Sequence, residues 1–355
     1  MKGFRSTWIA ILVAVSLALV FGTAFAKKGG NGKPGGGGGG GGGSTASGWM
    51  FVHTRWVEGG IWGQGWTDTA YRAINADGTV REVLEWPVNW YGSFGTSEHL
   101  HAGERVFCGL HESAPSSPLA LVARYSDGSE VALGSAVDGL DPYACSFGGD
   151  DSFITFGGML YHDNGERDVV LYWAPISWAT DGMPSLDANP VVVLEIGINI
   201  QNPWASSGWS WSPNGTQLVY SVQGTLRVAS FSLATGTPVL TGTSSYGTGG
   251  SPSWSPIDGS VDIAFADAGS IYRMKSDGSG RQELASPSRK SSLTAPQWSP
   301  DASHLVYRKL TNKKDSKFTI SVTNLMVIPA NGGEPTDISP ADDGNLSHTV
   351  HGWRD

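Results

Sequence analysis

The sequence has little cysteine, little charge and no long apolar run. Only two cysteines occur in 355 residues, and 15% of the residues are charged. Two cysteines supply too few thiolates for a typical structural zinc site. The apolar stretch near the start of the chain, from Trp8 to Val20, has 13 residues. That is too short for a convincing membrane-spanning helix.

Positive charge is scarce as well. The chain has 23 Lys and Arg against 32 Asp and Glu, a net charge of −9. Five of the basic residues lie in the first 33 positions, where there is no acidic residue, so the rest of the chain carries −14. Such an acidic surface argues against nucleic acid or anionic lipid as the partner. It is compatible with cations, basic proteins or neutral glycans.

The first 48 residues are not expected to belong to the folded domain. Lys2 and Arg5 precede the apolar stretch, and Ala24-Phe25-Ala26 follows it as a small-x-small cleavage site. We interpret residues 1–26 as a secretory signal peptide, with an uncleaved anchor as the alternative. Residues 27–48 include nine consecutive glycines and are predicted to be a flexible tether. The mature protein is therefore expected in the periplasm or outside the cell, with no membrane span after cleavage.

Secretion also bears on the two cysteines. Cys108 and Cys145 are 37 positions apart, in a chain that we expect to reach an oxidising compartment. They could form a disulfide, or remain as two buried thiols. The sequence leaves both alternatives open.

Three stretches of the sequence repeat one another. They are GWSWSPNGTQLVYS from Gly208, SPSWSPIDGSVDIAFA from Ser251 and APQWSPDASHLVYRK from Ala295. Their tryptophans are 43 and 44 residues apart. Each stretch reads as a short strand, a Ser-Pro turn with Asp or Asn, and an alternating apolar strand.

A second signature, a strand that runs into an Asp-Gly type of turn, occurs six times. Its turn residues fall at positions 77, 127, 181, 235, 277 and 331, so the copies are 42 to 54 residues apart. A unit of about 40–50 residues with four strands has the period of a propeller blade. We therefore predict an all-β, six-bladed β-propeller of four-stranded blades over residues 49–355.

The repeats resemble those of the TolB-like (WD40-like, PD40-type) β-propeller family. Pro252-Ser-Trp254-Ser-Pro256 and Pro296-Gln-Trp298-Ser-Pro300-Asp301 carry the likeness, which is strongest over residues 207–340. The resemblance implies the fold and says little about function. It also implies that TolB has an α/β domain where this chain has its glycine tether. A TolB-type partner interaction is therefore not carried over.

The last five residues, HGWRD, place Trp353 in register with the repeated tryptophans. They would form the inner strand of a blade whose other strands lie at the start of the fold, at 49–56, 70–78 and 80–86. We predict that this C-terminal strand joins the N-terminal blade and closes the ring, leaving no open edge.

The two faces of such a propeller should differ. The turns between the first and second strands and between the third and fourth strands of each blade share one face, and they are short and stereotyped. The other connections share the opposite face and vary, as binding loops do. We assign to this variable-loop face the segments 58–68, 108–119, 157–168 and 309–317, and also 86–96, 136–142, 196–206, 241–250 and 341–349.

Aromatic and polar side chains are dense in these segments. Glycine-flanked aromatics could stack on sugar rings or anchor a peptide, although they could also fill the interfaces between blades. The candidate ligand-binding residues are Trp62, Trp66, Trp86, Trp90, Tyr91, His162, Asp163, Trp204 and Tyr246. Residues 162–168 and 342–345 have oxygen ligands that could hold calcium, but they lack the spacing of a calcium loop, and we favour solvated turns for both. We expect no other cofactor.

Catalytic motifs are missing. No G-x-S-x-G elbow and no HExxH motif occur in the sequence. The leading hypothesis is a monomeric, non-catalytic module that binds a protein or a glycan through the variable-loop face. The alternative is a polysaccharide-active hydrolase or lyase whose acid–base groups, among them Glu98, His99, His101 and Asp163, converge in the central funnel. A third reading is an envelope scaffold held by its tether.

Overall fold

The part of the chain that the structure describes consists of strands and turns. In this computed structural model the described residues are 48–60, 63–84, 98–101, 104–112, 119–125, 130–134, 140–148, 152–161, 167–180, 183–187, 189–198, 208–315, 318–340 and 346–354. They all belong to one compact unit, Ser44–Asp355. None of them forms a helix that is long and apolar enough to span a bilayer. The predicted signal peptide and all but the last residue of the predicted tether lie outside the described residues.

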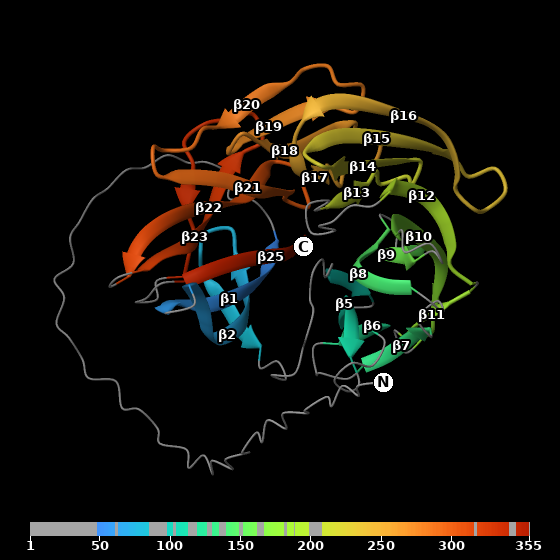
Figure 1. The fold of residues 1–355 in the computed structure, drawn as a ribbon, viewed down its shortest axis with the longest axis horizontal. Coiled ribbons are helices and arrows are strands. Elements are labelled where there is room, and N and C mark those ends of the chain that lie inside the picture. The colour runs from blue at the N-terminus through green and yellow to red at the C-terminus, as the bar shows by residue number, and fades with distance from the viewer. Residues whose placement is uncertain are drawn as a thin grey trace, which may run out of the picture. The chain divides into compact units, whose positions relative to one another are not determined.

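The described strands form six antiparallel sheets, which we number in chain order (Figure 1). The first sheet contains β25(Leu346–Arg354), β1(Trp49–Gly60), β2(Gly63–Asn75) and β3(Val80–Leu84). The second contains β4(Glu98–His101), β5(Glu104–Glu112), β6(Leu119–Tyr125) and β7(Glu130–Gly134). The third contains β8(Leu140–Phe147), β9(Phe153–Tyr161), β10(Arg167–Trp178), β11(Pro184–Leu186) and β12(Val191–Ile198).

The other three sheets cover the segment with the clearest repeats. The fourth contains β13(Trp209–Trp211), β14(Gln217–Val222), β15(Thr225–Ser232) and β16(Val239–Thr248). The fifth contains β17(Gly250–Trp254), β18(Asp262–Asp267), β19(Ser270–Lys275) and β20(Gln282–Ala285). The sixth contains β21(Ser291–Trp298), β22(His304–Asp315), β23(Phe318–Pro329) and β24(Thr336–Asp337).

The first sheet joins the two ends of the folded chain. Its order is β25-β1-β2-β3, so the last strand lies beside the first, as Figure 1 shows. The antiparallel register pairs Met50 with Trp353 and Trp56 with Leu346. The expectation that the C-terminal residues supply a strand to the N-terminal sheet is confirmed. The strand is longer than predicted, because it begins at Leu346.

The third sheet departs from the expected four strands. Strand β10 pairs with β12 through Asp168–Trp173 and with β11 through Ile176–Trp178. The copy of the strand-and-turn signature with its turn residue at position 181 was predicted to be a strand followed by a turn, like the other copies. The strand before that position is the long β10, and the extra short strand β11 adds a fifth member to this sheet.

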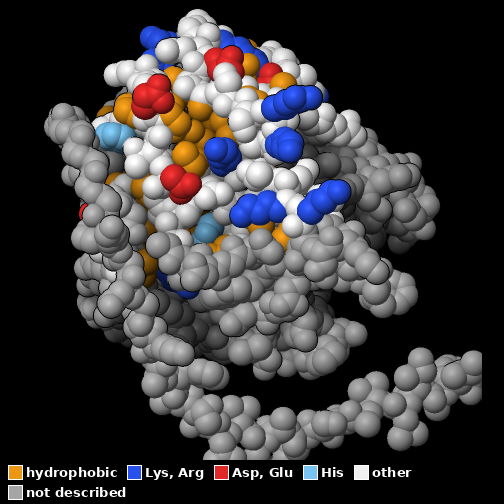
Figure 2. Space-filling view, turned by 90° about the vertical axis from the view of Figure 1, so that its left-hand side faces the viewer, with side chains coloured by type: hydrophobic (Ala, Val, Ile, Leu, Met, Phe, Trp, Pro, Cys, Tyr) orange, Lys and Arg blue, Asp and Glu red, His pale blue; other side chains and the backbone are white. Residues whose placement is uncertain are grey.

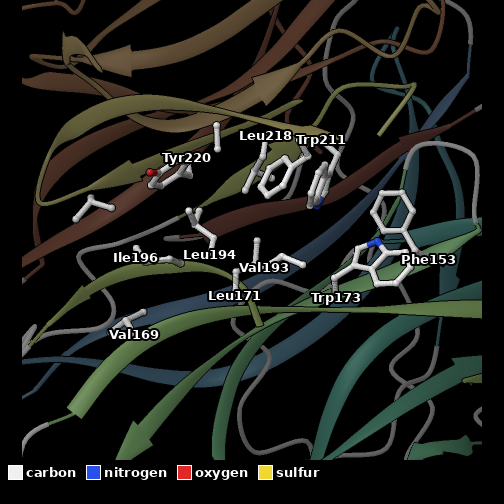
Figure 3. Close-up of a cluster of buried hydrophobic side chains, with 13 residues drawn as sticks. Phe153, Val169, Leu171, Trp173, Val193, Leu194, Ile196, Trp211, Leu218 and Tyr220 are labelled. Atoms are coloured by element: carbon white, nitrogen blue, oxygen red, sulfur yellow. The ribbon is translucent and has the colours of Figure 1, made fainter. Parts of the chain in front are cut away.

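The repeated tryptophans lie in the core between sheets. Trp211, Trp254, Trp298 and Trp353 are only 3–7% exposed. Each stands on the first strand of its sheet in spatial order and packs in a different hydrophobic cluster. In one of these clusters the rings of Trp211 and Phe153 meet edge to face at 5.3 Å (Figure 3). The same residue type at the same place in each repeat thus provides the packing between neighbouring sheets.

The hydrophobic clusters link the sheets one after another. Buried residues of the second and third sheets share one cluster, and those of the third and fourth share the next. Further clusters join the fourth to the fifth, the fifth to the sixth and the sixth to the first. Strand β25 of the first sheet also contacts β4 of the second.

A disulfide adds a covalent link between two sheets. Cys108 of β5 and Cys145 of β8 are bonded, with their Cα atoms 6.0 Å apart. Both are buried within the cluster between the second and third sheets. The alternative of two free thiols is therefore wrong.

Removing residues 350–355 should lower the Tm sharply. The deletion takes away most of β25, including Val350 and Trp353, which are buried against the sixth sheet. As a finer variant, Trp353→Ala should cost about 3–5 kcal/mol in urea unfolding, the usual result of emptying a buried aromatic site. Trp353→Phe, which keeps an aromatic ring, should cost less. An unchanged melting curve after the deletion would contradict the role assigned to β25.

Removing the disulfide should destabilise the protein without changing its fold. Closing a loop of 37 residues contributes roughly 3–4 kcal/mol in the chain-entropy model. The Cys108→Ser/Cys145→Ser variant, measured by denaturant unfolding, should lose about this much. Adding reductant should shift the wild type in the same way and leave the variant unaffected. Equal stability of wild type and variant would refute this estimate.

Candidate functional site

The turns of one face are built in the same way in different sheets. In the fourth sheet the buried Ser212 hydroxyl donates to Asn214 Oδ1 at 2.8 Å and accepts from the Gln217 N–H at 2.9 Å. In the sixth sheet Ser299 donates to Asp301 Oδ1 at 2.6 Å and accepts from the His304 N–H at 2.9 Å. The Trp-Ser-Pro motif thus encodes a self-satisfied turn, in which the serine closes the hairpin from inside.

The acidic version of this turn has a perturbed carboxyl group. Partial burial alone raises the pKa of Asp301, but hydrogen bonds from Ser299 and Ser303 and the nearby His304 outweigh it, and the pKa falls to about 2. Asn214 holds the same position in the fourth sheet and accepts equivalent bonds from Ser212 and Thr216. The face that carries these turns is therefore organised by hydrogen bonds internal to each turn.

Connections at the opposite ends of these strands differ strongly in length. Strands β14 and β15 are joined by Gln223-Gly224, and β18 and β19 by Ala268-Gly269. All four residues have positive φ, the geometry of a tight hairpin turn. Strands β22 and β23, in contrast, stay paired from His304↔Pro329 out to Asp315↔Phe318. The prediction of a charged loop over 309–317 is wrong in that residues up to Asp315 continue the ladder.

The segment 241–250 was also expected to be a loop. Instead, residues up to Thr248 belong to β16, which pairs with β15, and only Gly249 separates it from β17. Gly249 donates to Gly224 O at 2.9 Å, and a Cβ at this position would come within 2.8 Å of the Phe265 ring. Only glycine fits at this connection, because a side chain there would collide with Phe265 of the fifth sheet.

Tyr246 consequently lies in a strand and not in a binding loop. Its ring is half-buried between the fourth and fifth sheets and lies so close to Gly278 that a Cβ there would be 2.3 Å from it. Nearby, the Arg281 guanidinium lies over Phe265 at 4.9 Å and over Tyr272 at 4.7 Å, and it pairs with Asp267. These contacts favour interface packing as the role of Tyr246; binding of a ligand by this residue stays a prediction.

A buried polar cluster ties the sixth sheet to the first. Thr54 Oγ1 and His348 Nδ1 are 3.0 Å apart, and Thr323 Oγ1 donates to His348 O at 3.1 Å. Arg308 donates to Thr349 Oγ1 at 3.2 Å, and burial lowers the pKa of its guanidinium. Sequence reasoning missed this cluster, because its members come from β1, β22, β23 and β25 and share no motif. Its known partners are protein groups, so it fits a structural seam.

The remaining candidate residues cannot be placed against one another. Trp66 belongs to β2, where it is opposite Val57. The others lie outside the described residues: Trp62, Trp86, Trp90, Tyr91, His162, Asp163 and Trp204. The calcium candidates at 162–168 and 342–345 also fall largely outside the described residues. Among the residues that the structure describes, no group of three or more His, Cys, Asp or Glu side chains could hold a metal ion.

Comparison with known proteins gives a likeness of fold. No protein-family model matches the sequence, and a search of curated proteins finds no match. The chain is similar to a structure provisionally assigned as TolB from Agrobacterium tumefaciens, at 15% identity over 87% of this chain and 99% of that one, with a TM-score of 0.48. For TolB from Acinetobacter baumannii the identity is 14%, the coverage 82% and 69%, and the TM-score 0.42.

A chain in the crystal structure of a nidogen/laminin complex is similar at 9% identity over 84% of this chain and 98% of that one, with a TM-score of 0.50. TolB structures are thus among those similar to this chain, in agreement with the resemblance of its repeats. At such identities the likeness concerns the fold alone.

Substitutions at Asp301 and Asn214 should change the acid pH dependence of the Tm in opposite directions. Because the folded pKa of Asp301 is about 2, below the ordinary value of 3.8, its ionised form stabilises the fold above that ordinary value. This contribution is lost as the pH falls through the folded pKa. Asp301→Asn should flatten the decline of Tm between about pH 4 and pH 2, and Asn214→Asp should steepen it. Identical acid profiles for all three proteins would contradict the assignment.

Proposed function

We propose that the six sheets are the blades of a closed six-bladed propeller, and that the mature protein acts as a non-catalytic binding module in the periplasm or outside the cell. Its ligand, a protein or a glycan, would bind on the variable-loop face. The closure is supported by the pairing of β25 with β1, by the hydrophobic clusters between successive sheets and by the contact between β25 and β4. The location rests on the predicted signal peptide.

The observation that carries the proposal is the contrast between the two ends of the same strands. At one end, Ser212 and Ser299 close turns of one design in different sheets. At the other end, a two-residue connection in the fourth sheet contrasts with a long ribbon in the sixth. A scaffold that repeats at one face and varies at the other is the arrangement expected when selection for binding acts on the variable face.

Selective labelling can test which face binds. Because Cys108 and Cys145 are bonded to each other, a single introduced cysteine can be coupled to polyethylene glycol. Gln223→Cys places the polymer on the variable-loop face, and Thr235→Cys places it at the opposite end of the same sheet, so the two variants are matched. The probes are an array of purified polysaccharides and a set of purified secreted proteins.

For any probe that binds the unlabelled protein, the polymer at position 223 should abolish binding. The polymer at position 235 should leave binding of the same probe unchanged. The same polysaccharides should not be cleaved, as judged by reducing ends and by unsaturated products. The reverse labelling pattern would overturn the assignment of the face. Turnover that is lost on Glu98→Gln or His99→Ala would overturn the non-catalytic role in favour of a hydrolase or lyase.

A further inference from the structure

The strand pair β22–β23 is twice as long as the corresponding pairs in the two preceding sheets. It has 12 paired positions, whereas β14–β15 and β18–β19 each have six. Six additional pairs extend a ribbon by about 20 Å. The neighbouring inner strand β21 follows β22 only as far as the pair Ser291↔Thr311. The outer strand β24 pairs with β23 only at Met326 and Val327.

This ribbon is basic, although the protein is acidic. From Arg289 to Lys317 the sequence has seven basic residues and two acidic ones, so this segment concentrates positive charge in a chain of net charge −9. Lys and Arg side chains gather in the view of Figure 2, on the side where β22 and β23 lie in Figure 1. Local charge here is opposite in sign to that of the whole molecule.

Five cations of this segment form what we call the basic ribbon: Arg289, Lys290, Lys309, Lys313 and Lys314. Arg289 and Lys290 are the middle residues of a turn closed by the Ser291 N–H, which donates to Ser288 O at 3.0 Å. That turn leads into β21 beside the distal half of β22. Lys309, Lys313 and Lys314 lie along β22 itself, so the five residues share one end of the sixth sheet.

The charges of the basic ribbon are not neutralised within the described part of the chain. Four of the five side chains are exposed and Lys309 is half-buried. Among the described residues, none of the five has an ion pair or a hydrogen bond from its charged group. The half-buried Arg308, by contrast, donates to Thr349. The ribbon therefore presents its cations to an external anion.

Polar groups accompany the cations. Asn312 and Thr319 are exposed on the ribbon, and Ser321 donates to Asn312 Oδ1 at 2.8 Å. The exposed large apolar side chains of the described residues all lie outside β22 and β23. Protein interfaces usually depend on buried aromatic or apolar anchors. A surface of lysines, hydroxyls and amides fits a hydrated, hydroxyl-rich polymer better than a folded protein.

We propose that the basic ribbon binds an acidic polysaccharide, and that its five cations contact the carboxylates of the sugar units. This inference rests on the proposed function, since the ribbon lies at the variable-loop end of the sixth sheet. Four of the five cations in the sixth-sheet ribbon and its turn are lysines, compact point charges that need no bidentate geometry from the anion. The acidity of the rest of the surface repels long nucleic acids and limits the footprint to a short stretch of the polymer.

Alginate oligosaccharides are a suitable probe, and their carboxyl-reduced forms keep the sugar and remove the charge. We expect binding of the full mature protein to alginate, weaker binding as salt is added, and none to the reduced form. Lys313→Gln/Lys314→Gln and Arg289→Gln/Lys290→Gln should each weaken binding about thirtyfold, the combined effect of two exposed ion pairs at their upper strength. The matched control is Lys275→Gln, an exposed lysine on β19 outside the ribbon, which should bind as the wild type does.

Several results would overturn the inference. These are equal binding of the charged and reduced oligosaccharides, wild-type affinity in both double variants, no binding to alginate, or tighter binding to poly-glutamate or to duplex DNA than to alginate. Near-ultraviolet circular dichroism and Tm should match the wild type, so that loss of binding is not loss of fold. If polymer at position 223 blocks another probe while the ribbon variants bind that probe normally, the inference fails and the proposed function stands.

Discussion

The pairing of β25 with β1 is the constraint on which the rest of the structure depends. Each sheet packs its apolar side chains on the next one, and a chain of such sheets would expose an unpartnered face at each end. Placing the last strand in the first sheet brings the two ends together. Met50 and Trp353 then share a cluster with Val306 and Val327 of the sixth sheet. The polar seam of Thr54, Thr323 and His348 supplies hydrogen bonds at the same junction, where unpaired buried groups would be costly.

Within each sheet, the packing against neighbouring sheets and the closing of the turns depend on different residues. Tryptophans on the inner strands hold neighbouring sheets together, and serines in the turns of one face satisfy the backbone locally. Neither device uses the opposite ends of the strands. Those ends can therefore differ between sheets, from the tight Gln223-Gly224 turn to the long β22–β23 ribbon, without disturbing the packing. Binding chemistry can vary there while the core is kept.

The sequence predicted the scaffold well because the scaffold is repetitive. The spacing of Trp211, Trp254 and Trp298 indicated the sheets, and Trp353 indicated the strand that joins the two ends. Two of the local assignments that were wrong have a common reason. The segments around Tyr246 and Lys313 are rich in glycine, serine or lysine and read as loops, yet each is held as a strand by pairing with its neighbour. Strand formation at such positions depends on pairing with the neighbouring strand more than on local preference.

The candidate site was less predictable than the fold. The polar seam combines residues from strands that are far apart in the chain, and no spacing rule connects them. The basic ribbon comes from one turn and the strand that follows β21, but its extent depends on the pairing of β22 with β23. The extra strand β11 likewise has no counterpart in the other repeats. The cysteine pair could be suspected but not decided, because only the fold shows that β5 and β8 lie side by side.

Native-state hydrogen exchange of β25 tests the central claim most directly. If this strand joins the two ends of the fold, its amides paired with β1 should exchange as slowly as those of β14 and β15, through unfolding of the whole domain. If residues 346–354 exchange at the rate of an unprotected peptide while β14 and β15 remain protected, the C-terminal strand does not hold the first sheet to the sixth, and the account is contradicted.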